Sequence, residues 1–231
     1  MRNRSTSPRL LPPDALVKTG DVDHADWNHR PLLGSIMRLR FALIIELLAG
    51  RKFPRLLEIG YGSGVFLPEL SRSCEDLYGI DVHPSAQAVA RTLAGFDVAA
   101  KLFSGSATAM PFADDFFDAV VAVSALEFIE DLDAACLEIR RVLRPGGRLF
   151  IITPGYSPIA DFGLRILTGK SAKDDYSERR QRLLPTIRKH FAVERQLTAP
   201  PFGGTLIRLY TALELRGGQE PQHGDTEKAE G

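Results

Sequence analysis

Cysteine, histidine and tryptophan are scarce in this sequence. Its 231 residues include 2 Cys, 5 His and 1 Trp. The two cysteines, Cys74 and Cys136, stand far apart in helical patterns, and the histidines show no metal-binding spacing. The cysteines are therefore expected to act as small apolar residues in a reducing compartment, and no metal site is predicted.

Long uncharged runs and net charge are also missing. No stretch is long enough to cross a bilayer, and the basic N-terminus, residues 1–9, lacks the apolar run of a signal peptide. A cytoplasmic location is expected. The 29 basic residues equal the 29 acidic ones in number. A chain without overall basic charge gives no indication of a nucleic-acid partner.

The charges are unevenly distributed along the chain. Residues 1–55 carry 10 basic and 5 acidic side chains, residues 56–139 carry 3 and 14, and residues 140–216 carry 15 and 6. The acidic centre could dock on the basic flanks, or the flanks could present a basic rim to an anionic substrate. A third interpretation is that these are solvated faces.

Glycine is concentrated in one turn. Residues 55–65 read Arg-Leu-Leu-Glu-Ile-Gly-Tyr-Gly-Ser-Gly-Val, which predicts a strand, a sharp turn and the start of a helix. Gly60, Gly62 and Gly64 have no Cβ, so a ligand can lie against bare main chain. A dinucleotide fingerprint would need a small residue where Val65 stands, so a pyrophosphate is disfavoured. Glu58 suits a ligand with a cationic or hydroxyl-rich part.

Strands and helices alternate along the rest of the chain. The strands are apolar enough to be buried on both sides, which predicts a doubly wound α/β fold with a parallel sheet and a terminal strand pair. The expected strands are 55–59, 76–82, 98–103, 117–124, 148–153, 191–198 and 205–215. The expected helices are 31–50, 65–72, 85–94, 131–143 and 183–190.

Several distinctive residues follow the predicted strands, where open α/β sheets bind ligands. Asp81 comes 21 residues after Gly60, and its carboxylate could accept hydrogen bonds from both hydroxyls of a ribose. A lone Asp at a strand end is often only a helix cap. The glycine turn ahead of it favours the ribose interpretation.

Four ordered motifs resemble those of the class I S-adenosylmethionine-dependent methyltransferases. The glycine turn is similar to motif I. Residues 105–112 resemble the family's G-D-A-x-x-L-P-F segment, with Ser106 in place of the Asp that binds adenine. Residues 124–131 resemble the segment that passes the methionine part of the cofactor, and residues 140–149 the helix-turn before strand five. The resemblance covers residues 55–153 and is closest to the small-molecule branch with the ubiquinone and menaquinone enzymes.

The resemblance implies an α/β, Rossmann-like, doubly wound fold with a mostly parallel seven-stranded sheet and an antiparallel terminal strand pair. It also implies transfer of a methyl group from S-adenosyl-L-methionine to a small-molecule or lipid-like acceptor. Holding two reactants in line in a dry site can supply much of the catalysis. The cofactor-binding residues implied are Glu58, Gly60, Tyr61, Gly62, Gly64, Asp81, Val82, Ser106, Ala107 and Ser124.

No catalytic residue is assigned, because a proton acceptor is optional in this chemistry. The candidates for a base are Glu127, His29, Tyr156 and Asp161. Glu127 follows the fourth strand, but a carboxylate there could equally serve a helix N-terminus. Competing hypotheses are a catalytically inactive cofactor-binding partner subunit, an NAD-linked oxidoreductase and, least favoured, a nucleic-acid methyltransferase. The acceptor, its methylated atom and the oligomeric state cannot be read from the sequence.

The expected organisation is a loosely ordered segment 1–22, a methyltransferase domain 23–216 and a disordered tail 217–231. Within the domain, residues 23–50 form a helical cap and residues 155–182 a lid insertion. Trp27 in the cap could close over a ligand or pack the cap on the domain. The apolar residues of cap and lid predict a hydrophobic acceptor or peripheral membrane contact, with Arg38, Arg40, Arg165 and Lys170 available to anionic head groups, unless they only pack the lid.

Overall fold

The structure, a computed structural model, describes most of the predicted domain. Three predicted features lie wholly or mostly outside the described residues. They are the base candidates Tyr156 and Asp161, the lid 155–182, of which residues 156–173 are not described, and the tail 217–231, of which only residue 217 is described. The described residues are 8–20, 25–31, 33–155, 174–202, 204 and 207–217, of which 174–180 are described by their backbone alone.

Strands form in the apolar runs, and helices form between them. The strands are β1 (Phe53–Ile59), β2 (Cys74–Asp81), β3 (Lys101–Ser104), β4 (Phe117–Val123), β5 (Leu143–Pro154), β6 (Phe191–Ala199) and β7 (Tyr210–Gly217). The α-helices are α1 (Leu33–Leu48), α2 (Leu67–Leu70), α3 (Ala86–Ala94), α4 (Leu132–Val142) and α6 (Asp174–His190).

The strands make one seven-stranded sheet in the order β3-β2-β1-β4-β5-β7-β6. The first five strands run parallel, whereas β7 is antiparallel to β5 and β6 is antiparallel to β7. This topology confirms the predicted fold class. The order of addition reverses between β1 and β4, and ligands in such sheets bind beyond the carboxyl ends of the strands at that point.

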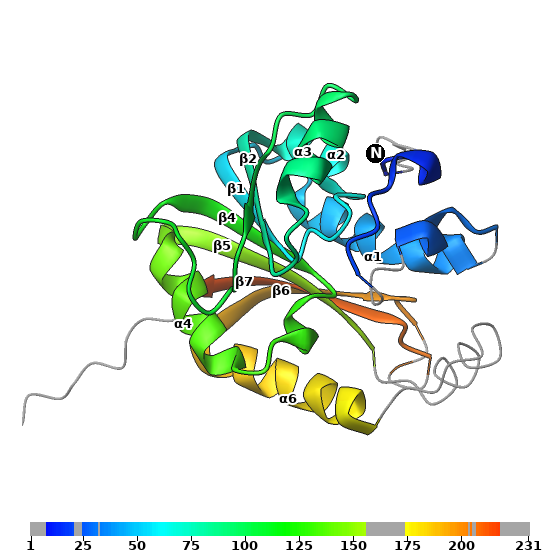
Figure 1. The fold of residues 1–231 in the computed structure, drawn as a ribbon. Helices are drawn as coiled ribbons and strands as arrows, with labels where there is room; N and C mark the ends of the chain where they lie inside the picture. Colours follow the sequence, from blue (N-terminus) through cyan, green and yellow to red (C-terminus); the bar gives the residue numbers. More distant parts are fainter. Residues whose placement is uncertain are drawn as a thin grey trace, which may run out of the picture.

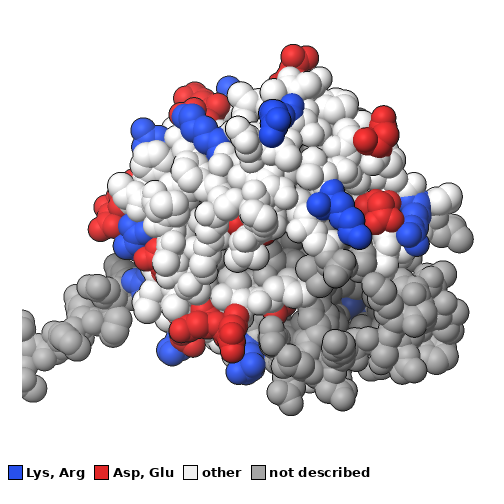
Figure 2. Space-filling model, in the orientation of Figure 1, with Lys and Arg blue, Asp and Glu red and all other residues white. Residues whose placement is uncertain are grey.

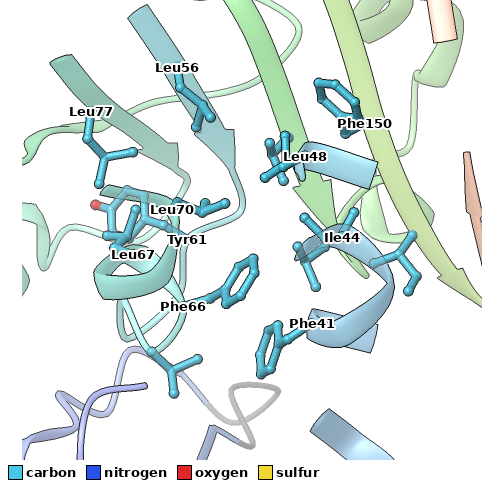
Figure 3. Close-up of a cluster of buried hydrophobic side chains, with 14 of the residues drawn as sticks. Phe41, Ile44, Leu48, Leu56, Tyr61, Phe66, Leu67, Leu70, Leu77 and Phe150 are labelled. Carbon is cyan, nitrogen blue, oxygen red and sulfur yellow. The ribbon is translucent and has the colours of Figure 1, made fainter. Parts of the chain in front are cut away.

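Helices cover both faces of the sheet, with α1, α2 and α3 on one side and α4 and α6 on the other (Figure 1). The strand period of two sends Leu56 to the α1 side and Leu57 to the α4 side, and both are fully buried. By the same period Glu58 points to the α1 side. Figure 3 shows Phe41 of α1 facing Phe66 of the glycine turn, with stacked rings 4.3 Å apart.

Part of the segment ahead of the cap packs on the domain. Residues 8–20 follow a defined path, in which the side chain of Leu11 is 1% exposed. The backbone N–H of Leu11 donates to the carbonyl of Val65 at 3.1 Å, and the N–H of Arg9 donates to the carboxylate of Glu69 at 2.7 Å. The polar, proline-rich composition of this segment gave no indication that Leu11 is part of the hydrophobic core.

Two helix boundaries differ from the predictions. The helix after the glycine turn begins at Leu67 instead of residue 65, because the three glycines ahead of it have low helical preference, and it gives way at Ser71 to a 3₁₀ turn. Pro68 stands in its first turn, where proline is tolerated. Helix α6 begins at Asp174, nine residues before its predicted start. Residues 174–182 are almost all polar, so no apolar periodicity marked them as helical.

The described surface carries mixed charges. On the face shown in Figure 2, basic and acidic side chains are interspersed around a largely uncharged centre. In the described part of the chain, no helix has the length and apolar character needed to span a bilayer.

Candidate functional site

A cavity of about 890 Å³ opens where the carboxyl ends of β1, β2 and β4 meet. Its walls come from two sources: the turns that follow these strands, and the N-terminal cap around α1. Nine of the ten predicted cofactor residues line it. The exception among those ten is Gly64, at which a Cβ would come within 2.8 Å of Val89 on α3. Gly64 therefore lets the turn approach the helix.

The glycine turn is held against both neighbouring strands. Gly60 has a φ of +74°, a conformation that other residues rarely adopt. Its N–H donates to the carbonyl of Ile80 at 2.8 Å, while a Cβ on Gly60 would lie only 2.4 Å from the Cβ of Ala125. This position therefore requires glycine for both its backbone conformation and its close packing.

Asp81 connects the end of β2 to the glycine turn. Its Oδ2 accepts the backbone N–H of Gly62 at 2.8 Å, and its Oδ1 accepts the N–H of His83 at 3.4 Å. A carboxylate has about four lone-pair positions, so these two bonds leave acceptor capacity directed at the cavity. This arrangement suits a pair of ribose hydroxyls.

His83 braces the same turn, and the sequence interpretation missed it. The N–H of Ser85 donates to His83 Nδ1 at 3.1 Å, so the ring proton is on Nε2, which donates to the carbonyl of Gly62 at 2.9 Å. The imidazole also packs edge-on against Tyr61, with ring centroids 4.9 Å apart. A histidine two residues after an acid carries no distinctive sequence signal.

Glu58 is a buried acid of the cavity with a raised pKa. Its side chain is buried, and burial together with the nearby charge of Asp81 raises its pKa to about 8, against the opposing effect of Arg40. Its Oε2 atom has no hydrogen-bond partner in the described part of the protein. A cationic ligand group at this position would satisfy the oxygen and favour the ionised form.

Two further buried polar atoms near the glycine turn have no hydrogen-bond partner among the described residues. The hydroxyls of Ser63 and Ser124 are buried without hydrogen bonds to described residues. Both residues line the cavity, and Ser124 has the unusual φ of +52° for a residue with a side chain. Buried polar groups in native proteins are normally hydrogen-bonded. The cavity is therefore suited to a ligand rich in polar groups on this side.

The predicted adenine side consists of Val82, Ser106 and Ala107. Val82 is 79% exposed although it is apolar, so it offers a flat surface for a ring to cover. The Ser106 hydroxyl lies 2.8 Å from the hydroxyl of Thr108 and accepts the Thr108 N–H at 3.2 Å. Ser106 thus shapes its own turn, and its predicted contact with adenine stays a prediction.

The rest of the cavity wall is mainly apolar, apart from Thr19, Arg40, Glu130 and Asp131. It consists of residues from the cap, from the segment after β4 and from the start of β7. Trp27 of the cap lies in this wall, beneath the guanidinium of Arg30, which is 5.6 Å from the ring centroid. The cap therefore contributes to the cavity as well as packing on the domain. The apolar residues of this wall are Ala25, Trp27, Ile36, Met37, Phe41, Phe128, Ile129, Leu209 and Tyr210.

The two described base candidates do not line the cavity. Glu127 is buried, 2% exposed, in a 3₁₀ turn, Leu126–Phe128, that packs against α6. His29 ends the 3₁₀ helix Ala25–His29. Neither contributes to the cavity wall, so no general base is assigned. In the described part of the chain, no three His, Cys, Asp or Glu side chains are grouped to hold a metal ion.

Comparison with known proteins agrees with this geometry. Residues 57–151 match the family model Methyltransf_11, described as a methyltransferase domain. A demethylmenaquinone methyltransferase of Mycobacterium marinum is 36% identical over 97 residues, which are 42% of this chain and 40% of that protein. A malonyl-acyl-carrier-protein O-methyltransferase of Methylococcus capsulatus is 32% identical over 170 residues, 71% of this chain and 56% of that protein.

Solved structures share the fold. The N-methyltransferase NodS from Bradyrhizobium japonicum WM9, in complex with S-adenosyl-L-homocysteine, has a TM-score of 0.60 at 18% identity over 87% of this chain and 95% of that one. The cyclase SpnF has a TM-score of 0.59 at 21% identity over 78% and 80%. Likeness at this level of identity concerns the fold alone.

The chain spans between 40% and 58% of the length of five of the curated relatives that it matches. The matched region contains the glycine turn, Asp81 and the strands around the cavity. Residues 57–151 therefore match a methyltransferase domain, and this region is similar to the class I S-adenosylmethionine-dependent methyltransferases.

Proposed function

We propose that the protein transfers a methyl group from S-adenosyl-L-methionine to a small apolar acceptor. The observation that carries the proposal is the composition of the cavity of about 890 Å³ described above. One side presents the glycine turn, Glu58 and Asp81, and the other presents the apolar wall from the cap. Ligand sites of 300–1,000 Å³ typically combine apolar walls with a few well-placed polar groups.

The cofactor fits the polar side. Asp81 would accept hydrogen bonds from the ribose hydroxyls, Val82 would cover the adenine, and Glu58 would face the charged amino-acid part. The cofactor supplies an electrophilic methyl carbon, which an acceptor nucleophile attacks in line. The residues of the chain hold the two reactants in line and exclude water, and this proposal requires no side-chain base.

The acceptor belongs to the apolar wall. Ile36 and Met37 on α1 and Phe128 after β4 line it, and Phe128 is 49% exposed. Relatives of the chain are named for menaquinone and ubiquinone biosynthesis. This combination favours a flat, lipid-like molecule such as a quinol. Peripheral membrane contact and a cytoplasmic location stay predictions.

Calorimetry with S-adenosyl-L-homocysteine and NAD tests the cofactor assignment. We expect micromolar affinity for S-adenosyl-L-homocysteine and none for NAD, and the reverse order would contradict the proposal. Incubation with methyl-labelled S-adenosyl-L-methionine and demethylated quinols then tests transfer. Cofactor binding without transfer to any small acceptor would favour the inactive partner subunit, and the neighbour named as a cyclase shows that this fold also carries other activities.

A further inference from the structure

Arg40 is the cation of the cavity wall. It projects from α1, and it is the only Lys or Arg among the described residues that line the cavity. Its Nη2 donates to the side-chain oxygen of Asn28 at 3.2 Å, and its guanidinium lies 4.8 Å from the ring centroid of Phe41. The guanidinium is therefore held between an amide and an aromatic face.

Asn28 is a fixed partner for this arginine. Its side chain is fully buried, at 0% exposure, and its Nδ2 donates to the carbonyl of Ala25 at 2.8 Å. The donor side of the amide is thus engaged, which leaves Oδ1 facing Arg40. The backbone carbonyl of Asn28 accepts Arg38 Nη1 at 2.5 Å, and a Cβ on Gly34 would lie 2.5 Å from the same oxygen. Asn28 is therefore locked through both its side chain and its backbone.

Glu58 places a carboxyl group in the same cavity. This carboxyl is on the α1 side of β1, and the positive charge of Arg40 lowers its pKa, against the larger effect of burial. Its Oε2 is buried and has no partner in the described part of the chain. A guanidinium and a carboxylate that both open into one cavity match the two charges of an α-amino acid: its carboxylate and its ammonium.

We propose that Arg40, oriented by Asn28, binds the carboxylate of the amino-acid part of the cofactor, while Glu58 accepts its ammonium group. The cap would then complete the cofactor site as well as line the acceptor wall. Arg40 touches the ligand, and Asn28 is a positioning residue. This inference rests on the proposed function, since it adds Arg40, with Asn28 to position it, to the site of the same cofactor.

A ligand that lacks the amino-acid part distinguishes a contact of Arg40 with that part from a general structural role of Arg40. 5′-Methylthioadenosine keeps the adenosine and the sulfur of S-adenosyl-L-homocysteine but has neither the carboxylate nor the ammonium. We expect Arg40→Met to weaken binding of S-adenosyl-L-homocysteine by roughly tenfold to a hundredfold, the range for a lost charged hydrogen bond, and to leave binding of 5′-methylthioadenosine within about twofold. Isothermal titration calorimetry measures both.

Arg91→Met is the control. Arg91 is an exposed arginine on α3 that donates to the carbonyl of Gln87 and does not line the cavity. Both ligands should bind this variant with wild-type affinity. If Arg40→Met weakens both ligands equally, its role is structural. If it weakens neither but lowers methyl transfer to an acidic acceptor, the arginine binds the acceptor. Either result overturns the inference. Failure of the wild type to bind S-adenosyl-L-homocysteine would instead reject the proposed function.

The role of Asn28 is tested by coupling. Asn28→Ala keeps the charge of Arg40 but removes its orientation, so S-adenosyl-L-homocysteine should bind less tightly and 5′-methylthioadenosine unchanged. The double variant Asn28→Ala/Arg40→Met should then bind no more weakly than Arg40→Met, because both changes remove one interaction. Additive losses would overturn the positioning role. Arg40→Lys keeps the positive charge but loses the paired N–H donors of the guanidinium, so this variant should bind S-adenosyl-L-homocysteine with intermediate affinity. It provides the same test if Asn28→Ala does not fold.

Discussion

The carboxylate of Asp81 accepts a hydrogen bond of 2.8 Å from the backbone N–H of Gly62. One side chain at the end of β2 thereby fixes the turn that follows β1. The same carboxylate keeps lone pairs for a ligand, so Asp81 shapes the site and, in the proposed function, also binds the cofactor. This double role makes its replacement informative.

Asp81→Ala should weaken binding of S-adenosyl-L-homocysteine by about 1.5–3 kcal/mol, the scale of hydrogen bonds to a charged group. The fold should persist, because the ladder between β1 and β2 does not depend on this side chain. Calorimetry gives the affinity. Asp76→Ala is the control, since Asp76 is on the same strand, pairs with Lys101 and does not line the cavity. Equal effects of the two substitutions would place the ligand elsewhere.

Gly60→Ala should destabilise the protein and reduce cofactor binding. The new Cβ would lie 2.4 Å from Ala125, and the φ of +74° adds the strain of a left-handed residue. Gly146→Ala isolates the two effects, because Gly146 has a φ of +80° with no atom within 4 Å of an added Cβ. We expect a loss of about 1 kcal/mol at Gly146 and a clearly larger one at Gly60, measured by urea unfolding. Matching losses would mean that Ala125 moves aside freely.

The parts of the site that the sequence predicted depend on local constraints. Apolar runs defined the strands, and alternate glycines defined the turn, because both patterns restrict the backbone whatever surrounds them. The pairing of Arg40 with Asn28 was not predicted, because it depends on a hydrogen bond between a 3₁₀ helix and α1. His83 was missed for the same reason: its partner, Gly62, is distant in the sequence. Tertiary contacts of this kind leave no periodic pattern.

The raised pKa of Glu58 predicts a pH-dependent stability. The folded state keeps a proton on this carboxyl up to pH about 8, whereas the unfolded chain loses it near its ordinary pKa of 4.5. The folded state therefore holds the extra proton in that window, and the free energy of unfolding falls as pH rises through it, by at most about 1.4 kcal/mol per pH unit. Glu58→Gln removes this contribution.

Urea unfolding of wild type and Glu58→Gln at several pH values checks the sign. The stability of the variant relative to wild type should increase from pH about 5 to pH about 8 and then level off. Other titrating groups cancel in the difference between the two proteins. A constant difference across the window would show that Glu58 ionises normally in the folded protein.

A second carboxylate, Glu138 on α4, holds the loop on the proposed adenine side of the cavity. Its Oε2 accepts the backbone N–H of Met110 at 2.9 Å, and its pKa is lowered by hydrogen bonds from Arg141. Arg141 donates in turn to the carbonyls of Met110 at 3.1 Å and Phe112 at 2.8 Å. The pair thus fixes both polar groups of Met110, in the loop that begins with Ser106 and Ala107.

Glu138→Ala should loosen this loop and weaken binding of S-adenosyl-L-homocysteine and of 5′-methylthioadenosine by similar factors, because both ligands carry the adenosine that we propose the loop to contact. This pattern differs from the one expected for Arg40→Met, which spares the ligand without an amino-acid part. Leu137→Ala, at an exposed position of the same helix, controls for general effects on α4. A loss confined to S-adenosyl-L-homocysteine would contradict the assignment, because it would place the amino-acid part, and not the adenosine, beside this loop.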